Sequence, residues 1–314
     1  MLYITEKEVR SMLNMEITIE ALEEAFIARS KGAIGNIPRS RLPINRGSYN
    51  LMAGSWKDKG VVGHKSYVAG ANGVSFHVML YSMNGEGLIA LIEADLMGQI
   101  RTGAASGIAT KYLSNPNSST VGIIGSGYQA ETQLEAVASV REISSVRVFS
   151  RSSEKREKFS NKMSAKHQLQ VEPVSSAYEA VDGAEIVITI TNSPTPVLTG
   201  DMLQKGMHIN AAGGNSWMRR ELDTASVSKC SLIATDDIDQ AKIECGELIR
   251  AAETGHFYWD SVVRLDHVVS GIITGRKDIE DVTLFQSQGV AFEDVAVCLK
   301  LYNLALEKGI GTKI

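Results

Sequence analysis

The sequence contains few cysteines and histidines, and the copies it has are scattered. Its three cysteines, Cys230, Cys245 and Cys298, have neither the spacing of a disulfide framework nor that of a metal site. The six histidines are dispersed in the same way. We therefore expect no disulfide scaffold and no metal centre.

Long apolar runs and basic runs are also missing. The longest apolar stretches have the length of a strand, far below the ~20 residues of a membrane span. A formal net charge of −4 without basic runs argues against a nucleic-acid partner. The first eight residues lack the basic start and apolar centre of a signal peptide, which predicts a cytoplasmic protein. With 314 residues and 44% hydrophobic residues, the chain is long enough for two globular domains.

The first third of the chain changes from helical to strand-like patterns. A capping box, Thr5 with Glu8, predicts a short first helix, and apolar residues at helical spacing predict a second over 18–31. Five short strand-like runs then follow without helices between them, which predicts an antiparallel sheet. These runs are 39–44, 49–56, 61–68, 75–81 and 88–94, with a hairpin turn at Asn84-Gly85.

Beyond a helical pattern over 95–113 and a polar break, strands and helices alternate. The expected strands are 120–124, 146–150, 185–191, 208–212 and 231–235, with helices such as 128–140 and 153–167 between them. Such alternation predicts an α/β fold with a Rossmann-type, doubly wound parallel sheet. A closing helix, 290–308, can return to the first domain. We expect a discontinuous α+β domain over 1–116 and 297–314, and a dinucleotide-binding domain over 117–296.

The first strand of the alternating part runs directly into Gly125-Ser126-Gly127-Tyr128-Gln129-Ala130, and a helix follows. This is the Gly-x-Gly-x-x-Ala turn that holds a dinucleotide pyrophosphate at a helix N-terminus. Gly125 permits the tight turn, Gly127 lets the backbone approach the phosphates, and Ala130 keeps the helix close to the sheet. The residues from Gly125 to Ala130, other than Ser126, are therefore expected to bind a cofactor.

The second strand of this part ends in Ser150-Arg151-Ser152-Ser153 and carries no carboxylate where NAD-binding proteins have an acceptor for the ribose. Arg151 can contact a 2′-phosphate, and the hydroxyls of Ser150, Ser152 or Ser153 can donate hydrogen bonds to it. NADP(H) is therefore favoured, and NAD(H) stays possible. The alternative is a solvated loop in which Ser153 caps the next helix.

Four motifs in order resemble the ornithine cyclodeaminase/mu-crystallin family over essentially the whole chain. They are 101–106 (RTGAAS), 121–130 (VGIIGSGYQA), 210–215 (NAAGGN) with Glu221-Leu222-Asp223, and 285–294 (FQSQGVAFED). The resemblance implies a substrate-binding and dimerisation domain, a Rossmann domain with the active site between the two, and a homodimer. It also implies an NAD(P)-dependent oxidoreductase acting on an amino or imino acid.

The resemblance places the substrate carboxylate on Arg39, Lys65 and Arg101, with Met52 in the substrate pocket and Thr102 and Thr191 at the cofactor. Arginine binds a carboxylate bidentately, and an unpaired lysine in an apolar strand would be costly. Arg101 near a helix start needs an anionic partner or a place beyond the first turn. Taken alone, Arg39, like its neighbour Arg41, is more often a solvated side chain.

The sequence departs from this family at two positions. Asn215 stands where the cyclodeaminase and alanine dehydrogenase members carry an acid/base aspartate, and an amide cannot take up a proton at neutral pH. Glu221 or Asp223 can substitute only if the following loop folds back. Asn50 replaces the glutamate that binds the ornithine side chain. Both departures argue against ornithine cyclodeamination.

The leading hypothesis is therefore an NAD(P)H-dependent reductase of an α-imino acid, with Lys65, or a water held by Asn215, handling the proton. An imine is often already protonated near neutral pH, so reduction demands little of an enzymatic acid. The alternatives are a cyclodeaminase-type lyase with retained NAD and a non-catalytic, mu-crystallin-like protein that binds NADPH and a ligand.

Three other constellations have structural interpretations. The acidic run 236–239 (DDID) is interpreted as a helix N-terminus rather than a metal site. Glu293 and Asp294 are expected to support packing near the cofactor. His64 should point to the strand face opposite Lys65, which makes it a poor catalytic residue.

Overall fold

The computed structural model describes residues 1–70 and 73–314, which divide into two compact units. Unit 1 consists of Met1–Arg101 and Gly289–Ile314, and unit 2 of Thr102–Gln288. The sequence placed these boundaries after residues 116 and 296. The first boundary lies earlier, within helix α3 (Asp95–Leu113), because the later part of this helix belongs to unit 2. There the side-chain amide of Gln133 donates to the carbonyl oxygen of Thr102 at 3.2 Å.

Unit 1 is built on one mixed sheet with helices at both chain ends. The capping box predicted at Thr5 and Glu8 is present at the first helix. Its elements are β1 (Leu2–Ile4), α1 (Glu6–Met12), α2 (Met15–Ser30), β2 (Ile34–Ile44), β3 (Gly47–Trp56), the 3-10 turn η1 (Lys57–Lys59), β4 (Val61–Gly70), β5 (Phe76–Ser82), β6 (Gly87–Glu93), α11 (Ala291–Lys308) and β15 (Thr312–Lys313).

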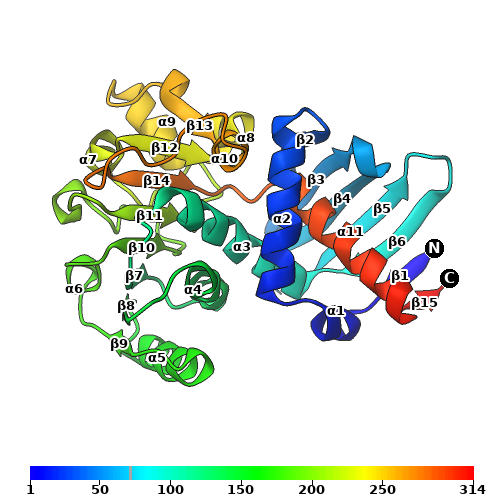
Figure 1. The fold of residues 1–314 in the computed structure, drawn as a ribbon, viewed down its shortest axis with the longest axis horizontal. Helices are drawn as coiled ribbons and strands as arrows, with labels where there is room; N and C mark the ends of the chain where they lie inside the picture. Colours follow the sequence, from blue (N-terminus) through cyan, green and yellow to red (C-terminus); the bar gives the residue numbers. More distant parts are fainter. Residues whose placement is uncertain (71–72) are drawn as a thin grey trace. The chain divides into compact units, whose positions relative to one another are not determined.

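The seven strands of unit 1 lie in the order β15-β1-β6-β5-β4-β3-β2. Strands β2 to β6 are antiparallel neighbours, as predicted. Strands β1 and β15 were not predicted, because segments of three and two residues are too short to show an alternating pattern. Helices α2 and α11 pack against each other and cover one face of the sheet (Figure 1).

Unit 2 contains the alternating part of the chain. Its elements after α3 are β7 (Thr120–Ile124), α4 (Tyr128–Val140), β8 (Ser145–Phe149), α5 (Ser153–His167), β9 (Val171–Pro173), α6 (Ala177–Val181), β10 (Ile186–Thr189), η2 (Gly200–Met202), β11 (His208–Ala211), α7 (Thr224–Lys229), β12 (Leu232–Thr235), α8 (Ile238–Glu244), α9 (Gly246–Glu253), η3 (Trp259–Ser261), β13 (Val262–Arg264), α10 (Leu265–Val269) and β14 (Thr283–Gln286).

The strands of unit 2 form a parallel sheet in the order β13-β12-β14-β11-β10-β7-β8-β9, which confirms the doubly wound fold. Side chains alternate between two cores: in β10, Ile186 and Ile188 pack with residues of α4 and α5, whereas Val187 packs with residues of α7, α8 and α9. Asp237 caps α8, as the acidic run predicted. Within the described residues, none of the helices is long and apolar enough to cross a membrane.

Candidate active site

Three buried cations gather in unit 1. Arg39 on β2, Lys65 on β4 and Arg101 on α3 are 8%, 3% and 5% exposed. Arg101 is the seventh residue of α3, so it lies beyond the first turn, where a cation is unfavourable. Burial of this kind requires nearby anions, because an unpaired charge in the interior costs several kcal/mol.

The anions come from the first turn of α11. The Lys65 ammonium donates to Asp294 Oδ1 at 2.8 Å, and Arg101 Nε donates to the same oxygen at 2.8 Å. Arg101 Nη1 donates to Glu293 Oε2 at 2.9 Å. Both carboxylates are fully buried. In unit 1, Glu293 and Asp294 are thus counter-ions of the buried cations, and their expected place near the cofactor stays a prediction.

Arg39 contacts the segment before α11 and strand β3. Its Nη2 donates to the carbonyl oxygen of Gly289 at 2.9 Å, and its Nε lies 3.4 Å from the sulfur of Met52. Met52, 1% exposed, is the cross-strand neighbour of Lys65. The structure thus brings together four residues that the resemblance assigned to the substrate: Arg39, Met52, Lys65 and Arg101.

The cluster combines cations with carboxylates. Lys65 and Arg101 pair with Asp294, Arg101 also pairs with Glu293, and the charge of Arg39 acts on Lys65. Burial and, after it, the charge of Arg101 lower the pKa of Lys65, Asp294 opposes the shift, and the resulting pKa is about 8. A carboxylate bound here would meet guanidinium groups and a lysine that exchanges its proton near neutral pH.

In unit 2 the glycine turn has the geometry of a pyrophosphate site. Gly125 has a φ of +117°, and a Cβ there would lie 2.3 Å from the carbonyl oxygen of Ile190, so only glycine fits. Gly127 precedes α4 without a side-chain cap, and a Cβ there would meet nothing within 4 Å. The helix N-terminus is therefore open to an anion, as a dinucleotide phosphate requires.

The topology places this turn at a switch point of the sheet. Strand β7 lies between β8 and β10, and the chain leaves β7 for β8 on one side and returns on the other through β10. Ligands of open α/β sheets bind outside the carboxyl ends of strands at such a point. Ala130, fully buried, packs in the core beneath α4, whereas Tyr128 is 56% exposed and Gln129 half-buried.

The end of β8 lies next to the glycine turn. The Ser126 hydroxyl donates to Ser150 Oγ at 2.8 Å, and Ser152 caps α5 by accepting from the Lys155 N–H at 3.3 Å. The cap is thus Ser152 rather than Ser153, which is the first helical residue. Arg151 is exposed and makes no hydrogen bond or ion pair with any residue of the described chain.

The segments that follow β10 and β11 contain Thr191 and Asn215. Asn215 is exposed, in a loop that continues to Glu221. That loop folds back: the Glu221 carboxylate accepts from the Thr191 N–H at 2.5 Å and from the Gly213 N–H at 2.8 Å. Burial raises the pKa of Glu221 to about 7, and the charge of Glu247 adds to the shift. The sequence allowed Glu221 to substitute for the missing aspartate only if this loop folds back.

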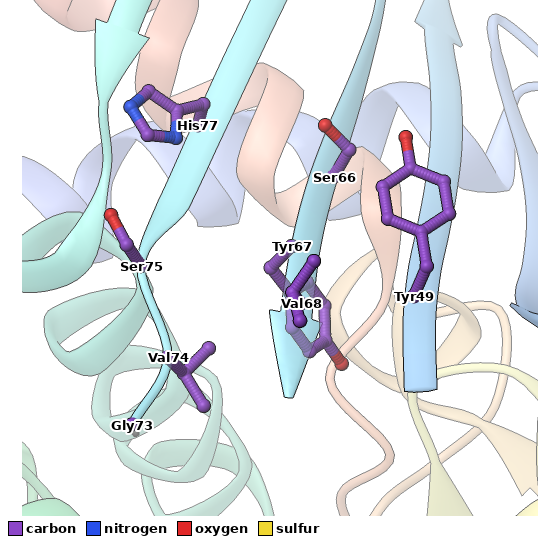
Figure 2. Close-up of a pocket in the computed structure, with 8 residues that line it drawn as sticks. All are labelled: Tyr49, Ser66, Tyr67, Val68, Gly73, Val74, Ser75 and His77. Carbon is purple, nitrogen blue, oxygen red and sulfur yellow. The ribbon is translucent and has the colours of Figure 1, made fainter. Parts of the chain in front are cut away.

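The face of the unit 1 sheet that α2 and α11 leave uncovered is apolar. Its exposed side chains are Ile37 (61%), Leu42 (63%), Tyr49 (37%), Leu51 (39%), Val62 (37%) and Val68 (49%). A cavity of about 500 Å³ opens at its edge, where Tyr49 of β3, Val68 of β4 and His77 of β5 line it (Figure 2). We call this surface the outer face. His64 lies on it, stacked on Tyr81 and opposite to Lys65, as the strand alternation predicted.

Comparison with known proteins places the whole chain in one group. The family model described as ornithine cyclodeaminase/mu-crystallin family matches residues 2–309. The Δ1-pyrroline-2-carboxylate reductase of Bacillus cereus is 34% identical, with 100% of this chain and 99% of the relative covered.

Two solved structures are also similar over their full length. The Δ1-pyrroline-2-carboxylate reductase of Thermococcus litoralis, in complex with NADH and L-proline, is 31% identical, with a TM-score of 0.96 and 100% of both chains covered. An archaeal alanine dehydrogenase dimer with bound NAD is 32% identical, with a TM-score of 0.94 and 100% and 98% covered. The chain belongs to the ornithine cyclodeaminase/mu-crystallin family.

Proposed function

We propose that this protein is an NAD(P)H-dependent reductase of an α-imino acid, with Δ1-pyrroline-2-carboxylate as the first substrate to test. The observation that carries the proposal is the buried cluster of Arg39, Lys65 and Arg101, three cationic side chains held together in unit 1. Guanidinium and ammonium groups in such a cluster can donate hydrogen bonds to a substrate carboxylate. Two similar proteins with 31% and 34% identity are named as reductases of that cyclic imino acid.

The residues of unit 1 have distinct roles in this proposal. Arg39 and Arg101 bind the substrate carboxylate, and Glu293 and Asp294 fix Arg101 and Lys65 in place. The cofactor supplies a hydride to the imine carbon. Lys65, with a pKa of about 8, is protonated at neutral pH and can donate to the substrate nitrogen or oxygen. Asn215 can orient a water but cannot itself supply a proton.

For the cofactor, we propose NADPH ahead of NADH. The support is local: the end of β8 offers no carboxylate to a ribose, and Arg151 is exposed beside Ser150 and Ser152. A guanidinium there can pair with a 2′-phosphate. The similar solved structures contain NADH or NAD, so both dinucleotides belong in the test.

We propose that the protein is a homodimer joined through the outer face. An apolar surface of this kind on a sheet is unfavourable in water and typical of an interface. A second copy offers the same apolar face, so two sheets can pack face to face. One similar archaeal protein is described as a dimer.

The decisive experiment follows the oxidation of NADPH and NADH at 340 nm, in parallel, with pyrroline- and piperideine-2-carboxylate and with oxoacids plus ammonia or methylamine. Steady turnover with an imino acid is expected. Ammonia release from ornithine without net cofactor change would support the lyase instead, and tight NADPH binding without turnover would support the binding protein. Asn50 argues against the lyase, because its buried amide donates to Ser48 and offers no carboxylate to an amine.

Variants of two arginines on β2 sharpen this experiment. Arg39→Met removes a buried guanidinium from the cluster and should raise KM for the imino acid by roughly 10- to 100-fold, the value of a charge-assisted hydrogen bond. Arg41→Met removes an exposed guanidinium from the same strand and should change KM by less than twofold. Equal effects of the two substitutions would contradict the assigned role of Arg39.

A further inference from the structure

Glu221 joins two segments that the sheet topology brings together in unit 2. Its side chain accepts three hydrogen bonds: from the Thr189 hydroxyl at 2.9 Å, the Thr191 N–H at 2.5 Å and the Gly213 N–H at 2.8 Å. Thr189 ends β10, Thr191 follows it, and Gly213 follows β11. The carboxylate therefore ties together the carboxyl ends of two neighbouring strands, beside the switch point where β7 ends.

The backbone of Glu221 is fixed as firmly as its side chain. Its carbonyl oxygen accepts from the N–H groups of Val197 and Leu198 at 2.7 and 3.0 Å. Its N–H donates to Glu247 Oε1 at 2.6 Å. Glu221 is 1% exposed, and its carboxylate cannot turn away without leaving several buried donors unsatisfied.

The segment after β11 approaches the segment after β10 so closely that only glycine fits at residue 213. A Cβ on Gly213 would lie 2.3 Å from the Thr191 carbonyl oxygen and 2.6 Å from Glu221 Oε1. The chain then continues for two residues to Asn215. The position of the loop that carries Asn215 therefore depends on the contact of Gly213 with Glu221.

We propose that Glu221 is a positioning residue, which holds the segments after β10 and β11 in the conformation that binds the nicotinamide half of the cofactor. This inference rests on one part of the proposed function, the binding of a dinucleotide by unit 2. Glu221 does not act on the substrate itself, because both of its oxygens are occupied by donors from the chain.

The three donors make this arrangement sensitive to protonation. An ionised carboxylate accepts on both oxygens, whereas a carboxylic acid presents one O–H to a site lined by donors. Burial raises the pKa of Glu221 to about 7, so the fully accepting form is present above pH 7 and is lost as the pH falls through that value. The titratable groups packed around it are Glu247 and Cys245, whose thiol donates toward Glu247 at 3.6 Å; burial raises the pKa of both.

The chain offers a matched control at the opposite end of the same strand. Glu185, directly before β10, also accepts from two backbone N–H groups and a threonine hydroxyl, those of Ser119 and Thr120. Glu185→Gln thus disturbs a similar set of hydrogen bonds at the amino edge of the sheet, where no cofactor is expected.

The test is the dissociation constant of NADH, measured by calorimetry between pH 6 and 8 for the wild type, Glu221→Gln and Glu185→Gln. NADH is used because the 2′-phosphate of NADPH itself titrates near pH 6. At pH 8 Glu221→Gln should weaken binding about tenfold and Glu185→Gln less than twofold. The wild type should lose about fivefold in affinity from pH 8 to pH 6, and Glu221→Gln should show no such dependence.

Glu221→Gln with wild-type affinity at pH 8 would overturn the proposal. So would equal weakening and equal loss of Tm in both variants, which is the signature of a merely structural role. If Glu221→Gln does not fold, a wild-type affinity for NADH that does not change with pH would also overturn the proposal. Turnover is a separate readout: failure with every imino acid would refute the reductase and leave a pH-dependent NADH affinity to support the role of Glu221.

Discussion

At the scale of single residues, the most informative feature is the sharing of Asp294 by two cations. Lys65 and Arg101 both donate to its Oδ1 at 2.8 Å, and the three side chains are buried, at no more than 5% exposed. Asp294 thus raises the pKa of Lys65 against the effects of burial and of the neighbouring arginines. Asp294 therefore favours the protonated form of Lys65.

We expect kcat/KM of the wild type to fall above about pH 8, as Lys65 loses its proton. Asp294→Asn removes the group that raises the pKa of Lys65, so this alkaline limb should move to lower pH by about one unit. The substitution also leaves Lys65 and Arg101 with less negative charge and should cost about 3 kcal/mol of stability. The measurements are pH profiles and thermal unfolding.

Lys65→Arg provides the matching control for this profile, because a guanidinium stays charged at every accessible pH. Any remaining activity of that variant should lack the limb near pH 8. A limb that persists in Lys65→Arg, or that does not move in Asp294→Asn, would assign the titration to another group.

At the scale of elements, the turn from β7 to α4 contains two glycines, Gly125 and Gly127, that differ in what the fold requires of them. Gly125 is required by the fold, since its φ is +117° and its neighbour is the Ile190 carbonyl oxygen. Gly127 has a φ of −82°, which any residue adopts, and faces open space. The packing of the described chain therefore does not require glycine at this position.

Gly127→Ala should leave Tm within about 2 °C of the wild type and weaken NADH and NADPH binding at least tenfold, because the added methyl group occupies the approach to α4. Gly125→Ala should lower both stability and affinity, by about 1–3 kcal/mol of unfolding free energy. Thermal unfolding and calorimetric titration of the two variants, side by side, test this division. Wild-type affinity in Gly127→Ala would refute a pyrophosphate at this turn.

Elements predicted from the sequence were those with a long periodic pattern or a clear cap. Helices α4 and α5 begin and end where the pattern placed them, and α3 was predicted over 95–113. The strands β9, β13 and β14 were missed, and their β-structure depends on neighbours in the sheet.

At the scale of the whole molecule, the outer face is the surface on which the proposed assembly rests. Leu42→Asp and Val68→Asp place a charge on that face, at side chains 63% and 49% exposed, and should convert the dimer to a monomer without unfolding unit 1. Light scattering after size exclusion measures the mass. Ile279→Asp, at a residue of unit 2 that is 74% exposed, should leave the mass unchanged. A wild-type protein that is monomeric at micromolar concentration would contradict the homodimer.

The sequence alone determined the two kinds of sheet and the chemistry of each candidate residue. Hydrophobic periodicity predicts the alternation of strands and helices, and six adjacent residues are enough to identify the glycine turn. Arg39, Lys65 and Arg101 could be named because their motifs resemble those of a known family. What they contact could not be predicted, since Asp294 is 229 residues from Lys65 in the chain.

Only the tertiary structure decided which charges neutralise one another and where the loops after the strands turn. It made Glu293 and Asp294 the counter-ions of buried cations, and it folded Glu221 back onto Thr191 and Gly213. The physical reason is the same in both cases. Local propensity follows from neighbours in the chain, whereas the pKa and the partner of a buried charge follow from groups that only the completed fold brings within hydrogen-bond distance.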